Sequence, residues 1–428
     1  MICSSSSLLI RRRPGEGRGP RGFTMVELLA VILILAVLIA LLLPAINGAL
    51  RTAKNAAVGS EINQLAQALA SFKAKYGDYP PSRVLLAEDG DYSGVSGVTG
   101  NVSLSITGTS QDINLGQLTQ RSVAALRKFF PSANFSTSGQ VFVGTTANPP
   151  AQWYDFNGNG NFDGQHYILQ GHQCLVFFLG GITQVTASGY GMSGFAKNPT
   201  NPFVNASVIT NRQPPFFEFN PARLALDPSN PYSAGGFGDP QIPGYMDTLG
   251  NESVNLSLIP NTTFTGFYMD TSAGMVNFYA YFSSYGNGGY DPNDVNFTES
   301  DAGGNSPIGL TFHVPFPVPG ATWPNSSASP APNPYTSALT AQFNTTTTPP
   351  TPLPTTYLNP QSFQIISSGI DGLYGVGGQY SPDNTGESLP LDRTTDPNGN
   401  GPYVNTSDVT IRTRERDNIT NFHNGKLE

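Results

Sequence analysis

Cysteine is almost absent from this chain of 428 residues, which contains only Cys3 and Cys174. A disulfide-rich scaffold and a CxxC motif are therefore excluded. Charged residues are also scarce: they make up 12% of the chain, roughly half of the usual share. The formal net charge is -8, and an acidic chain of this kind is poorly suited to nucleic acid. No nucleic-acid partner is expected.

Motifs of common enzyme classes are missing as well. The sequence contains no GxSxG, HExxH or GxxxxGK[ST] motif, and no GxGxxG after an expected strand. The histidines are scattered; they are His166, His172, His313 and His423. The spacing of His166 and His172 fits neither one helix face nor a common zinc site. Cys174 lies in the apolar run CLVFFL and is expected to be a buried small hydrophobe. We therefore expect that the chain is not an enzyme.

The most distinctive segment lies near the amino terminus. From Phe23 to Leu43 the chain is apolar except for Thr24 and Glu27. These 21 residues would reach roughly 31 Å as a helix, enough to cross a bilayer. The preceding leader, residues 1–22, contains a cluster of arginines and one acid: Arg11, Arg12, Arg13, Arg18, Arg21 and Glu16. The excess of arginines before the apolar run predicts a single membrane span with a cytoplasmic leader and an exported head.

A secretory signal peptide is the alternative for this segment, because it too combines a basic start with an apolar run. Three features disfavour it. The apolar run is longer than usual, no convincing small-residue cleavage site follows it, and Glu27 lies in its first turns.

Glu27 is energetically unfavourable in this position. A carboxylate inside a membrane helix costs about 2.5 to 3.5 kcal/mol near the bilayer centre and normally has a partner. If the chain is cut after Gly22, the new α-amino group of Phe23 is a cation that can pair with Glu27 of a neighbouring copy. Alternatively, Glu27 lies near the membrane interface and is simply solvated.

The string RGFTMVELLAVILILAVLIALLLP resembles the cleavage and methylation segment of type IV prepilins and type II secretion pseudopilins. The resemblance implies that a membrane prepilin peptidase cuts after Gly22 and that the amine of Phe23 is N-methylated. It implies that Glu27 guides insertion into a growing fibre of pilin or pseudopilin subunits on an inner-membrane assembly platform. The implied location is the bacterial inner membrane, in contact with lipid, and then a fibre in the periplasm or at the cell surface.

Pro44 is the twenty-second residue after the expected cleavage point. Proline removes a backbone donor and clashes with the preceding turn, so it should kink or locally melt the helix. The helix is expected to continue over residues 44–76, because apolar residues recur there at helical spacing. These residues are Ile62, Leu65, Leu69, Phe72 and Tyr76. Gly77 and Pro80 should end it.

Residues 77–428 are expected to form an extracytoplasmic head. Helical spacing predicts a helix over Gln117–Phe130, and β-rich apolar runs predict strands. The strands are expected at Val102–Ile106, Gln140–Val143, His166–Gln170, Cys174–Leu179, Met275–Phe282, Leu310–Val314 and Ser362–Ile366. A Pro/Thr-rich tract at 319–356 indicates an extended or disordered insertion. The expected fold class is α+β, with a long amino-terminal helix packed on an antiparallel sheet that carries long loops.

Near the carboxyl terminus, SFQIISSGIDGLYG and RERDNITNF resemble the end of the major pseudopilin of type II secretion. The resemblance implies a calcium site whose side-chain ligands are Asp371 and Asp417, with carbonyl groups from 366–368. Two features depart from that pattern: the insertion 375–416 separates the two pieces, and Asn418 replaces a second acid. Asp371 as a simple turn former is the alternative.

A second candidate calcium site is a loop that begins at Asp155. Its residues fit positions 1, 3, 5, 6, 7 and 9 of an EF-hand-like loop; they are Asp155, Asn157, Asn159, Gly160, Asn161 and Asp163. Position 12 is His166 instead of the usual bidentate Glu. The alternative is an Asn/Gly turn without metal. Calcium is the one cofactor that the sequence suggests, and none is required by it.

Two functions remain open on this sequence. The first is a structural subunit, major or minor, of a type II secretion pseudopilus or type IV pilus-like fibre. The second is a membrane-tethered or secreted glycan-binding protein or enzyme that uses a prepilin leader, since the head is large for a major subunit.

Overall fold

The computed structural model describes most of the amino-terminal two thirds of the chain and parts of the remainder. The described residues are 24–93, 101–106, 109–186, 189–205, 207–208, 210–226, 238–247, 249, 278–285, 289–290, 334–337, 343–344, 351–352, 356–370, 374, 378–380, 382, 389, 415–423 and 425–427. The chain divides into two units, residues 1–52 and 53–428.

The first unit contains the beginning of helix α1, Met25–Tyr76. Its apolar side chains are exposed, from Met25 at 88% to Leu50 at 54%. The helix continues through Pro44, which leaves a kink as the outcome still expected at that residue. Only one intrahelical hydrogen bond depends on the missing N–H, and the flanking leucines and alanines favour helix.

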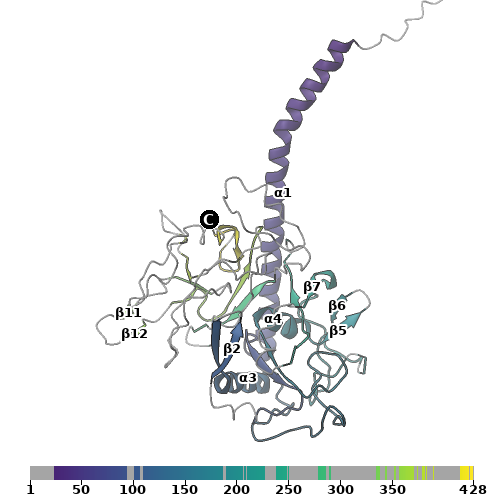
Figure 1. Ribbon diagram of the computed structural model, residues 1–428, viewed down its shortest axis with the longest axis vertical. Helices are drawn as coiled ribbons and strands as arrows, with labels where there is room; N and C mark the ends of the chain where they lie inside the picture. Colours follow the sequence, from purple (N-terminus) through teal and green to yellow (C-terminus); the bar gives the residue numbers. More distant parts are fainter. Residues whose placement is uncertain are drawn as a thin grey trace, which may run out of the picture. The chain divides into compact units, whose positions relative to one another are not determined.

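The second half of α1 belongs to the same unit as the head, residues 53–428. Of the predicted apolar stripe, Ile62, Leu65, Leu69 and Phe72 are buried there, and Tyr76 is partly buried against the same core. Val58, which was not part of the prediction, is buried as well. Figure 1 shows this half of α1 beside helix α4 (Gly171–Gly180), and the Phe72 and Phe178 rings are 5.9 Å apart. The helix ends at Tyr76 because Gly77 adopts a φ of 85°, a left-handed conformation that favours glycine.

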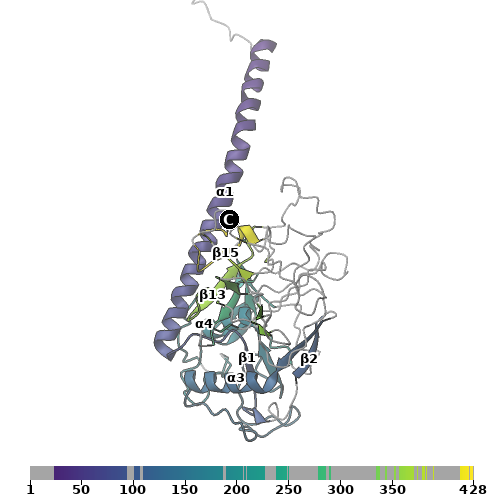
Figure 2. The ribbon, with the colours of Figure 1, turned by 90° about the vertical axis from the view of Figure 1, so that its left-hand side faces the viewer.

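One strand pair and a helix packed on it form part of the core of the head. Strand β1 (Val84–Ala87) pairs antiparallel with β4 (His166–Leu169), and helix α3 (Leu115–Phe129) packs below β1 (Figure 2). The backbone N–H of Leu85 donates to Ser122 Oγ of α3 at 2.8 Å. The hairpin of β2 (Asn101–Ile106) and β3 (Thr109–Asn114) precedes α3.

The largest sheet among the described residues has three strands, which come from distant parts of the sequence. Its strand order is β15 (Ile419–Thr420), β13 (Phe363–Ser367) and β9 (Ala280–Ser283), all antiparallel neighbours. Smaller elements complete the head. They are β5 (Thr183–Thr186) with β6 (Gly189–Met192), the 3-10 helix η1 (Pro221–Arg223), β7 (Leu224–Ala225) with β8 (Gly244–Tyr245), β10 (Tyr335–Thr336) parallel to β14 (Gly378–Gln379), and β11 (Phe343–Asn344) with β12 (Thr351–Pro352).

The α+β class is confirmed, although the strands are divided among several small sheets instead of one. The predicted helix over Gln117–Phe130 is α3, and the predicted strands at Val102–Ile106, His166–Gln170 and Ser362–Ile366 are β2, β4 and β13. The described end of Met275–Phe282 contains β9. The prediction at Leu310–Val314 and most of the tract 319–356 lie outside the described residues.

Two strand predictions are wrong. Cys174–Leu179 lies inside α4, where every residue is buried. A helix buried on all sides has no polar face, so its sequence resembles that of a buried strand. Gln140–Val143 forms no strand; the backbone N–H groups of Val141 and Phe142 both donate to the Asp89 carbonyl. Cys174 itself is buried, as expected.

Candidate functional site

The first turn of α1 contains a reciprocal cap. Thr24 donates to Glu27 Oε2 from both its backbone N–H and its hydroxyl, each at 2.9 Å. The Glu27 N–H donates back to Thr24 Oγ1 at 3.2 Å. This is a capping box, in which the Thr-x-x-Glu spacing satisfies the open N–H groups of a helix start. The carboxylate also lies at the positive end of the helix dipole. The Thr-x-x-Glu spacing alone could have predicted this cap from the sequence.

The segment that follows the cap has the properties of a membrane span. Among the described residues, α1 is the one helix that is long and apolar enough to cross a membrane. The window that meets this criterion has no side chains buried in the protein. Pro44 lies inside the helix and gives no N–H to the preceding turn; a kink there stays a prediction. Gly22 and Phe23 lie outside the described residues.

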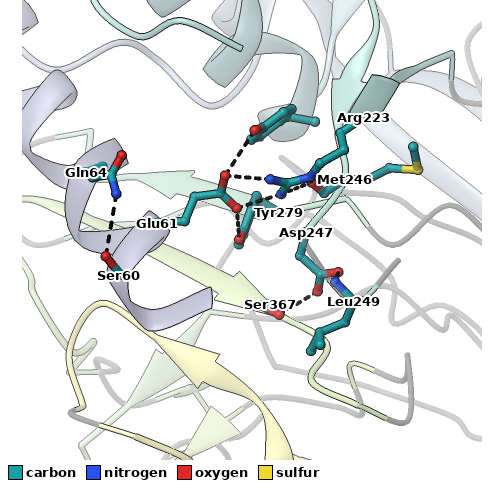
Figure 3. A network of polar contacts seen from close by, with 10 residues as sticks. Ser60, Glu61, Gln64, Arg223, Met246, Asp247, Leu249, Tyr279 and Ser367 are labelled. Carbon is teal, nitrogen blue, oxygen red and sulfur yellow. Dashed lines mark hydrogen bonds and ion pairs between the residues drawn. The ribbon is translucent and has the colours of Figure 1, made fainter. Parts of the chain in front are cut away.

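Within the head, α1 is fixed by a bidentate ion pair. Arg223 donates from Nη1 to Glu61 Oε1 at 2.7 Å and from Nη2 to Oε2 at 2.6 Å. Tyr245 and Tyr279 add hydroxyl donors to the same carboxylate at 3.0 and 2.6 Å (Figure 3). The side chains of Arg223 and Glu61 are only 16% and 13% exposed. The carboxylate of a residue on α1 therefore has four protein donors from the head.

The surroundings of this ion pair connect it to the central sheet. Arg223 Nε also donates to the Met246 carbonyl at 2.9 Å. The next residue, Asp247, accepts from Ser367 Oγ of β13 at 2.6 Å (Figure 3). Burial, followed by the nearby Glu61 charge, raises the pKa of Tyr245 to about 12, so its hydroxyl remains a donor at neutral pH.

The structure gathers the predicted loop residues around Asp163. Asn157 and Asn159 donate from their Nδ2 atoms to Asp163 Oδ2, at 3.2 and 2.8 Å. Asp155 Oδ2 accepts from the Gly160 N–H at 2.9 Å. Asp155 and Asn157 are buried, each with 3% of its surface exposed. Positions 3 and 5 of the loop therefore converge on one carboxylate oxygen of position 9.

A buried acidic residue from another part of the chain contacts this loop. Glu88 is fully buried, and its Oε2 accepts from the N–H groups of Asp163 at 2.8 Å and Gly164 at 3.0 Å. The Tyr167 hydroxyl lies 3.1 Å from both Glu88 Oε1 and Asp163 Oδ2. Burial, with a smaller contribution from the charge of Asp163, raises the pKa of Glu88 to about 8.

His166, at position 12 of the loop pattern, takes no part in this cluster. Its Nε2 lies 3.0 Å from the Asp91 carbonyl oxygen. The local sequence gave no signal for Glu88, because this residue comes from the end of β1 and reaches the loop only through the β1–β4 pairing. Across the described residues, no three His, Cys, Asp or Glu side chains form a metal-ligand group by themselves. A metal in this loop would depend on amide and carbonyl oxygens as well.

The carboxyl-terminal prediction is only partly within the described residues. Asp371 lies outside them. Asp417 Oδ2 accepts from the Ile370 N–H at 2.8 Å, next to the end of β13, where Ile366 pairs with Thr420. The backbone of 366–368 and the Asp417 side chain thus lie close to the same turn. Calcium at this turn stays a prediction.

Comparison with known proteins identifies the amino-terminal segment. Residues 17–43 match the family model described as the prokaryotic N-terminal methylation motif, which is the prepilin-type leader. No curated protein and no solved structure matches the chain. The motif implies processing by a prepilin peptidase and assembly with other pilins, and it covers the Thr24–Glu27 cap and most of the exposed apolar segment. The resemblance stated for the amino terminus is confirmed.

Proposed function

We propose that this protein is a structural subunit of a type II secretion pseudopilus or a type IV pilus-like fibre. The observation that carries the proposal is the coincidence, within residues 17–43, of the methylation motif, an exposed apolar helix and one capped carboxylate. A prepilin peptidase would remove residues 1–22 and methylate Phe23. The remaining helix would hold the protein in the inner membrane and then in the fibre.

Glu27 has the chemistry needed to align one subunit on another. Both hydrogen bonds that its carboxylate accepts from Thr24 use Oε2, and no described residue donates to Oε1. A cationic amine at Phe23 of a neighbouring copy would form an ion pair with the Glu27 carboxylate. In a medium of low dielectric, where an unpaired charge is costly, this pairing is favourable. Because Thr24 already orients the side chain, less conformational entropy is lost when the pair forms.

A fibre subunit must also transmit force from its helix to its head. The buried stripe on the second half of α1 and the Glu61–Arg223 pair supply that connection inside the head. A tethered binding protein would need only a flexible linker at this point. We assign no catalytic activity, since the prepilin-type motif is typical of structural proteins.

The test is the amino terminus of the protein taken from native membranes. Intact mass and sequencing should give a chain that begins at N-methylated Phe23, and the same protein from cells without prepilin peptidase should retain residues 1–22. The fibre fraction should contain the processed form. An uncut chain in normal cells, or a chain cut after the apolar run, would contradict the proposal.

A further inference from the structure

The loop 155–163 contains two Asn–Gly pairs, Asn157–Gly158 and Asn159–Gly160. In such a pair the backbone nitrogen of the glycine can attack the side-chain amide carbon of the asparagine, because glycine has no side chain that blocks the approach. The product is a five-membered cyclic imide. Its formation requires the asparagine side chain to fold over the next peptide group, and its opening requires water. The structure gives the two pairs different surroundings.

The side chain of Asn159 is folded over the peptide group of Gly160. Asn159 Oδ1 accepts from the Asn161 N–H at 2.7 Å, a turn that directs the amide carbon back toward the intervening Gly160 nitrogen. The same hydrogen bond withdraws electron density from the amide carbonyl group, as the donors of an oxyanion hole do. Asn159 Nδ2 donates to Asp163 Oδ2 at 2.8 Å. The electrophilic carbon is thus held in one orientation beside the nucleophile.

The nucleophile, the Gly160 nitrogen, directs its hydrogen at a carboxylate. The Gly160 N–H donates to Asp155 Oδ2 at 2.9 Å. Asp155 can therefore accept the proton that this nitrogen loses when it attacks. Gly160 is exposed, so water can reach the imide and open it. Base, nucleophile and electrophile all come from one short loop.

The Asn157–Gly158 pair lies in a closed environment. Asn157 is 3% exposed, and its Nδ2 lies 3.2 Å from Asp163 Oδ2 and 3.4 Å from the Tyr167 hydroxyl. A Cβ at Gly158 would clash with the Thr183 carbonyl oxygen, so this peptide group is packed against β5. Burial on both sides denies water access to this pair, which makes it an internal control for Asn159.

We infer that Asn159 modifies itself by cyclisation with Gly160 and is converted to aspartate and isoaspartate. A bond forms between the Gly160 nitrogen and Asn159 Cγ, and the bond between Cγ and Nδ2 breaks. Nδ2 leaves as ammonia, with the proton that the Gly160 nitrogen has lost through Asp155. One water molecule then opens the imide: attack at Cγ gives aspartate, and attack at the backbone carbonyl carbon of residue 159 gives isoaspartate. No group is oxidised or reduced, and the inference is independent of the fibre role.

The modification changes the electrostatics of the loop. The hydrogen bond from Asn159 Nδ2 to Asp163 Oδ2 is lost, and a carboxylate replaces the amide beside Asp163. Like charges this close repel each other. The modified head should therefore have a lower melting temperature than the unmodified head.

The experiment follows the full chain, purified from membranes in detergent, during incubation at neutral pH. Peptide mass spectrometry measures the small mass increase that accompanies replacement of an amide by a carboxyl group, and fragmentation assigns it to a residue and separates aspartate from isoaspartate. The increase should appear at Asn159 at least tenfold faster than at Asn157. Asn159 should also react in the folded chain at least as fast as in the chain unfolded in urea, whereas Asn157 should react far more slowly when folded.

Three variants test the assignment of the reacting groups. Asn159→Gln keeps an amide but would need a larger ring, so the modification at this position should disappear. Asp155→Asn keeps an oxygen that can accept the Gly160 N–H but removes the base, so the modification should slow several-fold. Asn161→Gln is the matched control: it changes an exposed amide and keeps the backbone N–H, so the rate should stay that of the wild type.

Three results would overturn the inference. They are an unmodified Asn159 in the folded chain, equal rates at Asn157 and Asn159, and a folded-state rate at Asn159 below that of the unfolded chain. A wild-type rate in Asp155→Asn would overturn the role of Asp155 as base. If near-ultraviolet circular dichroism shows that Asp155→Asn does not fold, the comparison of folded and unfolded wild-type chains decides whether the loop assists the reaction.

Discussion

Arg223 contacts both carboxylate oxygens of Glu61, at 2.7 and 2.6 Å, across 162 residues of sequence. Glu61 lies on α1 and Arg223 at the end of η1. A bidentate Arg–carboxylate pair has a fixed geometry and little freedom to slide. Together with the hydroxyls of Tyr245 and Tyr279, it sets the position of the second half of α1 within the head.

Glu61→Ala should destabilise the head strongly. Removing one partner of a buried ion pair leaves the other charge uncompensated, which costs about 3 to 5 kcal/mol. The measurement is chemical denaturation of the full chain in detergent. The matched control is Asp78→Asn, which breaks the exposed pair with Lys128 at 2.8 Å and should cost less than about 1 kcal/mol. Equal losses in the two variants would show that the Glu61 pair does not fix the helix.

Phe72→Ala should also destabilise the head, for a different reason. Phe72 is fully buried, and its ring lies 5.1 Å from that of Phe129 and 5.3 Å from that of Phe216. A Phe→Ala change in a packed core costs about 3 to 5 kcal/mol. Leu41→Ala is the control, because Leu41 is 72% exposed and should leave the melting temperature of the head unchanged. A similar loss in both variants would contradict this assignment of the core.

The sequence predicted the features that depend on local spacing and missed those that depend on pairing. The stripe of Leu65, Leu69 and Phe72 was visible because a helix with one buried face has a period of 3.6 residues. Helix α4 was mistaken for a strand because burial on every side removes that period. Burial of α4 follows from its contacts with distant elements, which no local pattern records.

The loop 155–163 shows the same difference between features set by local spacing and features set by strand pairing. Asp155, Asn157, Asn159 and Asp163 could be grouped from their spacing, and the structure brings them together. Glu88 could not, because it lies 75 residues from Asp163 in the chain and reaches the loop only through the strand register. Pro44 shows a third limit: sequence rules identify a weakened hydrogen bond but not whether the neighbouring turns hold the helix together.

Gly22→Val should block leader removal. We propose cleavage after Gly22, and a peptidase pocket shaped for glycine would have no room for a β-branched side chain. The intact mass of the protein from membranes should then be that of the chain with residues 1–22 attached. A mature product of normal mass would contradict this cleavage point.

The carboxyl-terminal turn gives a prediction separate from the loop 155–163. If calcium binds there, Asp417→Asn should remove most of the rise in melting temperature that calcium produces, by mass action on the folded state. A calcium response in Asp417→Asn equal to that of the wild type would show that calcium does not bind at this turn.

Glu27→Ala should separate membrane anchoring from fibre assembly. The apolar helix that follows is unchanged, so the variant should still fractionate with the membrane, but its share in sheared fibres should fall at least tenfold. Thr24→Ala is the decisive companion variant. It removes the side-chain half of the cap and leaves the Glu27 charge in place. If Glu27 acts by pairing with the amine of a neighbouring subunit, Thr24→Ala should retain most of its fibre incorporation. If both variants lose incorporation equally, the cap itself is what assembly requires, and intermolecular pairing through Glu27 is wrong.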